Sequence, residues 1–314
     1  MTRPSYSTAN LFMLFLLSYN ILLALTISYL YWGMWHGTPV GEQIGSPWFL
    51  VINQVLGLLV PMFIFRAITG EYRHLKLFCQ IKKKPLGIVN IMLIIALSLL
   101  LQPLMMLFSA IASLFLPNPV TGMISELAIL PLPIALIIVA LTPSICEEWV
   151  FRGFVQSKYE DQPIVVAAVV NGLFFGMIHM NLHQFSYAFV MGIVFAVIVY
   201  YTRSVLSGVL AHFVVNATQY TLGYWAATHH ITPSYANGTF YDSDLWPAII
   251  ELGIFSLYLL PIVVGLFYIF IKHNLRRNPV KTVADPKKVK PRHPFDMAFW
   301  AVVLVYGLIV LSLM

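Results

Sequence analysis

The chain alternates long apolar runs with short polar segments. A run of about 20 apolar residues is long enough to cross a bilayer as a helix, and we count nine such runs. They lie near residues 10–32, 48–68, 87–116, 127–150, 164–181, 185–201, 205–223, 246–271 and 297–314. The ninth run follows a charged segment with several prolines and could be peripheral. We therefore predict an all-α fold, a polytopic membrane helix bundle of eight to nine transmembrane helices.

Composition supports an integral membrane protein. Of the 314 residues, 60% are hydrophobic and only 10% are charged, with a mean hydropathy of +0.83. Soluble domains carry about 25% charged residues, so this balance excludes an ordinary soluble enzyme. Cys79 and Cys146 are the two cysteines and lie far apart in the sequence. A disulfide framework is therefore not expected.

The positions of the charges predict the orientation in the membrane. Most of the 18 Lys and Arg residues fall in two clusters, Arg66–Lys84 and Lys272–Arg292. The loops on the other side, 33–47, 117–126 and 224–245, contain acids and no Lys or Arg. This positive-inside pattern places the N-terminus in the cytoplasm. The net charge of +6 is then explained by topology and contact with the lipid bilayer, and we expect no nucleic-acid partner.

Two glutamates and two histidines lie well inside apolar runs, away from the ends where Glu251 could reach interfacial water, and their presence there requires an explanation. Glu147 and Glu148 are adjacent in the fourth run, His179 lies in the fifth and His212 in the seventh. A charge at the centre of a transmembrane helix costs about 2.5 to 3.5 kcal/mol on insertion scales, so such residues face a cavity or a partner and mark functional sites. We take these four as the candidate site.

Helical spacing assigns different roles to the two glutamates. Residues four apart share a helix face, whereas neighbours point about 100° apart. Glu148 can therefore pair with Arg152, which leaves Glu147 directed elsewhere and free for chemistry. The same spacing pairs Phe175 with His179 and His212 with Asn216.

Pro143 lies just before the glutamates and disturbs their helix. Proline cannot donate a hydrogen bond, so the carbonyl of Val139 is left unpaired. Either the helix kinks at this point, or it restarts with Ser144 and Glu147 in capping-box spacing. The sequence leaves both alternatives open.

Three motifs on successive apolar runs resemble a known family. They read EExxxR (Glu147 to Arg152), FxxxH (Phe175 to His179) and HxxxN (His212 to Asn216). In this order they are similar to the CPBP intramembrane protease family, which includes the type II CAAX prenyl endopeptidases and the bacterial Abi proteins. The resemblance divides the chain into N-terminal helices without a matched motif (1–126), catalytic core helices (127–223), and a part with an outer loop, C-terminal helices and a basic cytoplasmic linker (224–314).

The family resemblance implies hydrolysis of a peptide bond in a membrane-bound peptide or protein substrate. It assigns catalysis to Glu147, His179, His212 and Asn216, with Glu148, Arg152 and Phe175 in support. Cys146 lies beside the site but is more typical of a small packing residue than of a nucleophile. His183 also lies four residues after His179, a spacing that could chelate a metal, but we expect it to lie past the helix end in an outer connection.

Two mechanisms fit these residue types. In the first, His179 and His212 hold Zn²⁺, with Glu147 or Asn216 as a further ligand, and the metal lowers the pKa of a bound water. In the second, Glu147 and His179 activate water, while His212 and Asn216 donate hydrogen bonds to the developing oxyanion. Asparagine is a poor zinc ligand, which favours the second slightly, and both stay open.

The sequence does not select one substrate. The layout resembles the bacterial branch of the family, so we expect the bacterial cell membrane and a role in peptide maturation or bacteriocin immunity. A CAAX prenyl endopeptidase is the alternative. The alternatives from other functional classes are a non-catalytic membrane scaffold and an ion-coupled transporter. The complete motif argues against a scaffold. No paired inverted repeat, which is typical of transporters, is recognisable.

Overall fold

A computed structural model describes residues 5–44, 46–70, 86–160, 162–229, 242–278 and 294–313. All regular structure in these ranges is helical, and they contain no strand. Cys79 and most of the two basic clusters lie outside the described residues. The α-helices are α1 (Ser5–Leu30), α2 (Pro39–Ile44), α3 (Pro47–Gln54), α4 (Val60–Thr69), α6 (Ile88–Leu100), α7 (Gln102–Ser113), α8 (Pro119–Leu127), α9 (Leu132–Leu136), α10 (Thr142–Glu148), α11 (Ile164–Met177), α12 (Leu182–Thr202), α13 (Val205–Thr228), α14 (Asp242–Arg277) and α15 (Met297–Leu313).

The helices confirm the polytopic membrane fold. Six helical stretches are long and apolar enough to cross a bilayer. They are Tyr6–Trp35, Pro47–Thr69, Ile88–Ser113, Leu132–Tyr159, Leu182–Thr202 and Leu245–Arg277. Ile164–Met177 and Met297–Ser312 are shorter apolar helices, and α13 adds 24 residues of lower hydropathy. Each of the nine predicted runs therefore corresponds to a helix or helical stretch, which agrees with eight to nine spans.

Among the described residues, buried apolar side chains form two large hydrophobic cores and a small third one. The first joins α1, α4, α11 and α15 to the residues that follow α10, and Phe12, Phe151 and Phe174 are fully buried in it. The second joins α6, α7, α12, α13 and α14, around Ile94 and Phe195. The candidate site lies where these cores meet.

Four π-helical segments interrupt the long helices, and two of them come just before a proline. They are η1 (Tyr31–Trp35), η2 (Val55–Leu59), η4 (Ile137–Leu141) and η5 (Trp149–Val155), and a 3₁₀ turn, η6 (Gln156–Tyr159), follows η5. Pro61 follows η2 and Pro143 follows η4 by two residues. Because proline cannot donate to the preceding turn, the wider π turn accommodates the missing bond without ending the helix. Such segments often occur at functional sites.

Helices α11 and α12 approach each other closely through two glycines. A Cβ atom on Gly172 would lie 2.7 Å from the carbonyl oxygen of Phe189 and 2.8 Å from Cγ1 of Ile193. A Cβ on Gly192 would lie 2.7 Å from the Cα of Gly172. Small residues at a membrane helix contact allow the backbones to approach and pack. This contact sets the position of α12 against the site.

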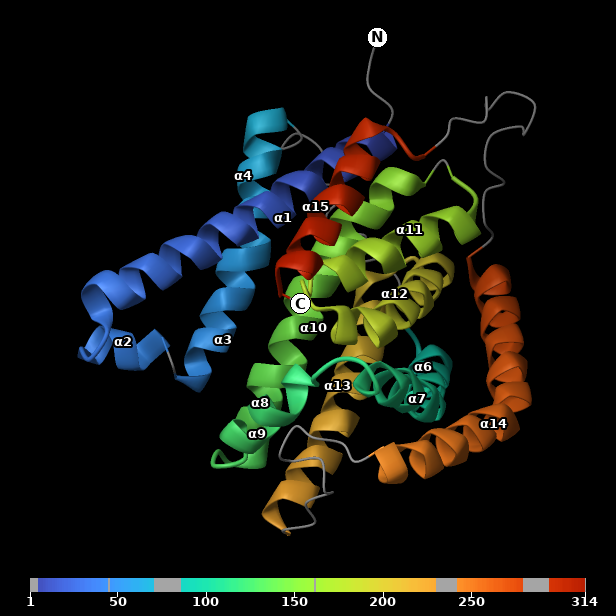
Figure 1. Ribbon diagram of the computed structural model, residues 1–314. Coiled ribbons are helices and arrows are strands. Elements are labelled where there is room, and N and C mark those ends of the chain that lie inside the picture. Colours follow the sequence, from blue (N-terminus) through green and yellow to red (C-terminus); the bar gives the residue numbers. More distant parts are fainter. Residues whose placement is uncertain are drawn as a thin grey trace.

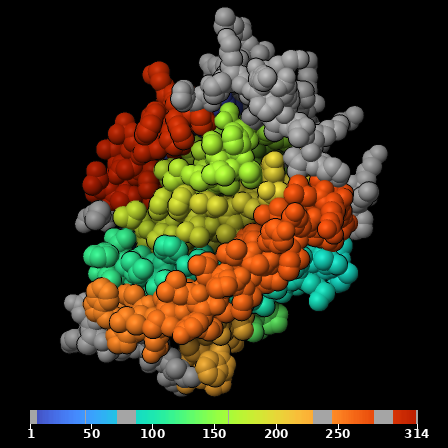
Figure 2. Space-filling model, turned by 90° about the vertical axis from the view of Figure 1, so that its right-hand side faces the viewer, coloured from blue at the N-terminus to red at the C-terminus, as the bar shows by residue number. Residues whose placement is uncertain are grey.

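Helix α14 lies on the outside of the bundle. Figure 2 shows it running diagonally across one face, and Figure 1 shows that it bends along its length. Pro247 and Pro261 lie inside this helix, and an interior proline kinks a helix. Only 11% of its most apolar window is buried, against 50% for Leu132–Tyr159. We therefore assign α14 to the lipid-facing surface and the Leu132–Tyr159 helix to the centre.

Replacing Gly172 by alanine should destabilise the protein. The added methyl group meets backbone atoms of α12, and overpacking of this kind costs about 1 to 3 kcal/mol. Thermal unfolding of the purified protein in detergent should show a lower midpoint for Gly172→Ala. Gly265→Ala in α14 is the matched control, because a Cβ there would meet nothing within 4 Å. Equal loss of stability in both variants would contradict the close contact.

Candidate active site

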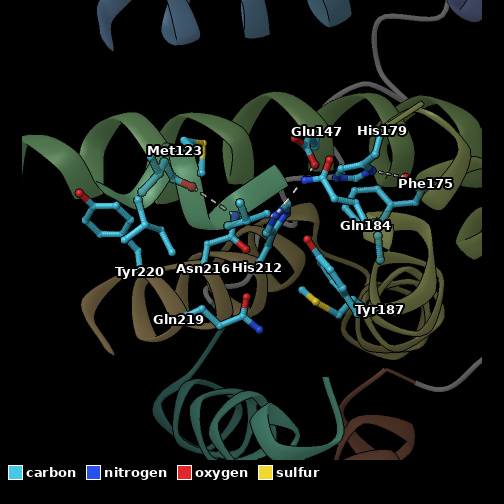
Figure 3. Close-up of a pocket in the computed structure, with 15 residues that line it drawn as sticks. Met123, Glu147, Phe175, His179, Gln184, Tyr187, His212, Asn216, Gln219 and Tyr220 are labelled. Atoms are coloured by element: carbon cyan, nitrogen blue, oxygen red, sulfur yellow. Dashed lines mark hydrogen bonds and ion pairs between the residues drawn. The ribbon is translucent and has the colours of Figure 1, made fainter. Parts of the chain in front are cut away.

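The predicted site residues line one cavity of about 130 Å³. Figure 3 shows Glu147, His179, His212 and Asn216 around it. They come from three parts of the bundle: α10, the turn after α11 and the middle of α13. Phe175 also lines the cavity, whereas Glu148 and Arg152 lie behind it. The three motifs therefore meet in space, as the spacing predicted.

Glu148 and Arg152 form the expected ion pair one helical turn apart. Nη1 of Arg152 donates to Oε1 of Glu148 at 2.8 Å, and both side chains are fully buried. Nη2 of the arginine donates to the carbonyl of Gly192 at 3.1 Å. The guanidinium also lies 4.4 Å from the ring centroid of Phe175 and 5.3 Å from that of Phe195. These contacts hold the guanidinium through Nη1, Nη2 and two aromatic rings, and they explain the motif position of Phe175.

Glu148 also orients His212. Nδ1 of the histidine lies 3.1 Å from Oε1 of Glu148, so it is the donor to that carboxylate. The imidazole stacks on Phe195 at a centroid distance of 5.2 Å and contacts Phe175 edge-on. Nε2 is then directed to the cavity, 3.9 Å from Oε2 of Glu147. One carboxylate orients the ring and the other lies near its reactive nitrogen.

Asn216 is held by the backbone carbonyl that Pro143 leaves without a helical donor. Its Nδ2 lies 3.3 Å from the carbonyl oxygen of Val139 and 3.2 Å from Nε2 of His212. Both distances are at the long end of the hydrogen-bond range. The helix continues through Pro143 from η4 into α10, and Oγ of Ser144 bonds the carbonyl of Ala140. The capping-box alternative is therefore wrong, since no helix begins at Ser144.

His179 lies in the turn after α11 and has a defined tautomer. Its Nδ1 lies 2.9 Å from the carbonyl oxygen of Phe175, and a carbonyl can only accept, so Nδ1 carries the proton. In the neutral ring, Nε2 is then a free acceptor. The side chain is partly exposed and lines the cavity. It can accept a proton from a molecule in the cavity.

Glu147 has a neighbour that the sequence did not suggest. Nε2 of Gln54 donates to its Oε1 at 3.3 Å, from the end of α3. Oε2 of Glu147 is buried and has no hydrogen-bond partner. Gln184, Tyr187 and Gln219 add further polar groups to the cavity wall. A search for amides inside the apolar runs would have found Gln54.

The described residues do not form a metal site. Among them, no group of three or more His, Cys, Asp and Glu side chains could hold an ion. Nδ1 of His212 is engaged by Glu148, and Asn216 lies at hydrogen-bond distance from its Nε2. A zinc site requires three or four protein ligands, and the described His, Cys, Asp and Glu side chains bring no such group together. The zinc expectation stays a prediction.

His183 does not lie in an outer connection. It lies in the first turn of α12 and is 1% exposed, with Nε2 at 2.9 Å from Oγ of Ser113. It is not part of the cavity lining. Helix α12 begins after Asn181, whose side chain caps the N–H of Gln184, and this cap includes His183 in the helix. The residue therefore joins α12 to α7.

Breaking the buried ion pair should lower the free energy of unfolding. Glu148→Ala or Arg152→Ala leaves an unpaired charge in the bundle, which costs about 3 to 5 kcal/mol. Unfolding of detergent-purified variants should show this loss, whereas Glu42→Ala, which removes an exposed acid, should stay within about 0.5 kcal/mol. Stability of Arg152→Ala equal to that of wild type would show that the pair is not buried in the folded protein.

Comparison with known proteins identifies the central part of the chain. Residues 129–218 match the family model described as type II CAAX prenyl endopeptidase Rce1-like. Comparison with curated proteins and with solved structures found no match. The matched segment contains all seven motif residues, from Glu147 to Asn216. Residues 129–218 are therefore similar to the Rce1-like members of the CPBP family, and they lie in an integral membrane protein.

Proposed function

We propose that the protein is an intramembrane endopeptidase in which Glu147 activates the attacking water. One observation carries this proposal: the two adjacent glutamates have different environments. Oε1 of Glu148 is bound by Arg152 at 2.8 Å. Oε2 of each carboxylate is buried without a hydrogen-bond partner among the described residues, but only Glu147 lines the cavity. A carboxylate oxygen without a partner is available to accept a proton. The family match supports a protease of this general class.

His179 completes the base. Its Nδ1 donates to a backbone carbonyl, which leaves Nε2 free. The side chain lines the same cavity as Glu147. A water between them would donate one proton to the carboxylate and be oriented by the imidazole. General-base assistance of this kind contributes roughly 10² to 10⁴-fold to a rate. The water oxygen then attacks the scissile carbonyl carbon.

His212 and Asn216 are placed to stabilise the oxyanion. Glu148 holds the proton on Nδ1 of His212, and a second proton on Nε2 would make that nitrogen a donor to the cavity. Nδ2 of Asn216 makes two long contacts, at 3.2 and 3.3 Å, and a substrate oxygen can replace one of them. As the tetrahedral intermediate collapses, the C–N bond breaks and the amine takes the proton from Glu147. Donors aimed at the developing charge are worth several kcal/mol.

We propose that this mechanism works without metal. The donor set does not bring three ligands together, and each of the four residues has a role without an ion. If zinc were bound, its ligands would be His179 and His212, and it would supply a bound water of low pKa. Nε2 of His179 is free for such an ion, whereas Nε2 of His212 would have to give up its contact with Asn216.

The substrate is a membrane-anchored peptide or protein. The cavity, at about 130 Å³, is smaller than the roughly 300 to 1,000 Å³ of pockets that enclose a whole small molecule. It therefore accommodates a short piece of extended chain, while the rest of the substrate stays in the bilayer. Peptide maturation or bacteriocin immunity in a bacterial cell membrane fits this description. The family description favours a CAAX prenyl endopeptidase as the second candidate.

Glu147→Gln should abolish proteolysis and leave the fold intact. The amide keeps the shape and cannot take a proton, so the rate should fall by roughly 10² to 10⁴-fold. Mass spectrometry of peptide termini in host membranes and medium, at matched expression, should find termini that appear with the wild type and are absent with Glu147→Gln. Identical termini with Glu147→Gln and wild type would remove the protease assignment and favour a scaffold or a transporter.

The metal-free mechanism predicts that chelation leaves activity unchanged. The purified enzyme should cleave a substrate found in that experiment equally well before and after treatment with a zinc chelator, and elemental analysis should find less than stoichiometric zinc. Loss of activity on chelation, with recovery on adding Zn²⁺, would establish the zinc mechanism instead.

A further inference from the structure

The two ends of the bundle differ in charge. Arg152 contacts Gly192 and Gln156 contacts Ala196, so the helix of the glutamates and α12 run in the same direction. They end together, at Tyr159 and Thr202, and α11 and α13 begin at that end. We call it the basic end, because Lys158 and Arg203 lie there and Asn278, after Arg276 and Arg277, bonds the carbonyl of Tyr201.

The opposite end, which we call the neutral end, has no basic residue in its connections. The described residues of this end are 114–131, 178–181 and 224–229, and they contain no Lys or Arg. Its described part includes α8 and the turn between α11 and α12. By the positive-inside rule the neutral end faces away from the cytoplasm.

The cavity is closed toward the basic end. Directly behind Glu147 lie Glu148 and Arg152, with exposed fractions of 0% and 3%, packed against Phe195 at 1%. One turn further, Nε2 of Gln156 bonds the carbonyl of Ala196 at 2.8 Å. The buried ion pair and this hydrogen bond form a floor. A peptide could pass only by breaking a buried charge pair, which costs several kcal/mol.

The cavity extends toward the neutral end. From α12 it is lined only by the first half of the helix, Gln184 to Met191, and from α13 only by the middle turns, His212 to Tyr220. Helix α8, which lies wholly at the neutral end, covers it with Val120, Met123 and Ile124. The opposite face of α8 is exposed and polar, with Thr121, Ser125 and Glu126.

The cavity wall on this side has the chemistry of a peptide-binding channel. Gln184 and Gln219 each offer amide donors and an acceptor, and Tyr187 offers a hydroxyl (Figure 3). The apolar side chains of α8 lie on the same cavity. An extended peptide needs donors and acceptors for its backbone and apolar contacts for its side chains. The polar groups and the apolar side chains both lie between the neutral end and Glu147.

We propose that the scissile segment reaches Glu147 from the neutral end, alongside α8. Resting on the proposed protease function, this assigns the substrate class: a membrane-anchored peptide whose cleavage site lies on the extracytoplasmic side. A prenylated tail in the cytosol would approach the closed floor. The site therefore serves exported peptides rather than cytosolic CAAX tails.

Cysteine accessibility tests the direction of access without a substrate. Gln219→Cys places a thiol in the cavity, in a background with Cys79→Ser and Cys146→Ala. Glu126→Cys and Glu160→Cys report the neutral and basic ends, since both positions are exposed. A small, charged, membrane-impermeant methanethiosulfonate reagent is applied to intact cells and to inside-out vesicles. Unmodified thiols are then counted with a maleimide mass tag after denaturation.

We expect Gln219→Cys to follow Glu126→Cys, with at least tenfold faster modification in intact cells than in inside-out vesicles, and Glu160→Cys to show the reverse. Modification of Gln219→Cys only in vesicles, or from neither side while both controls react, would overturn the proposal. Gln184→Cys serves if Gln219→Cys does not fold. Since labelling requires no proteolysis, an inactive enzyme with neutral-end labelling would refute the protease function alone.

Discussion

The buried ion pair between Glu148 and Arg152 is the interaction on which the site depends. Two charges have been removed from water at a cost of several kcal/mol each, and a pair of well-packed apolar residues would often be as stable. What the pair provides is orientation. Through one carboxylate oxygen it fixes Arg152 at 2.8 Å and His212 at 3.1 Å. Removing the pair would leave the imidazole stacked on Phe195 but without a defined tautomer.

The surrounding helices are shaped to hold this pair. A Cβ on Gly208 would collide with Oε2 of Glu148, so α13 must present a glycine there for the carboxylate to fit. Gly192 gives its carbonyl to Arg152, and its missing side chain allows α11 to approach α12 and place Phe175 against the guanidinium. Each glycine therefore contributes through the space or the carbonyl that it leaves available. The positions of the motif residues therefore depend on these close helix contacts.

Helical spacing was enough to predict the local part of the site. The pairs Glu148 with Arg152 and His212 with Asn216 follow from residues four apart on one helix, and the structure shows both contacts. The rest depends on how helices pack. Gln54 contacts Glu147, which is 93 positions away, and Asn216 contacts the carbonyl of Val139, which is 77 positions away. No periodicity in the sequence predicts such contacts. His183 was misplaced because the capping role of Asn181, which starts α12 one residue later, was not recognised.

The charge balance of the site links structure to reactivity. Two buried carboxylates face one buried guanidinium, so this part of the bundle lacks one positive charge. The carboxylate that no arginine neutralises lies at the cavity, where Oε2 of Glu147 is 3.9 Å from Nε2 of His212. Because Arg152 already neutralises Glu148, the excess negative charge belongs to the cavity side. A carboxylate in this position can accept the proton that a water gives up when it attacks a carbonyl. Because Arg152 is paired with Glu148, Glu147 is the carboxylate left to take up this proton.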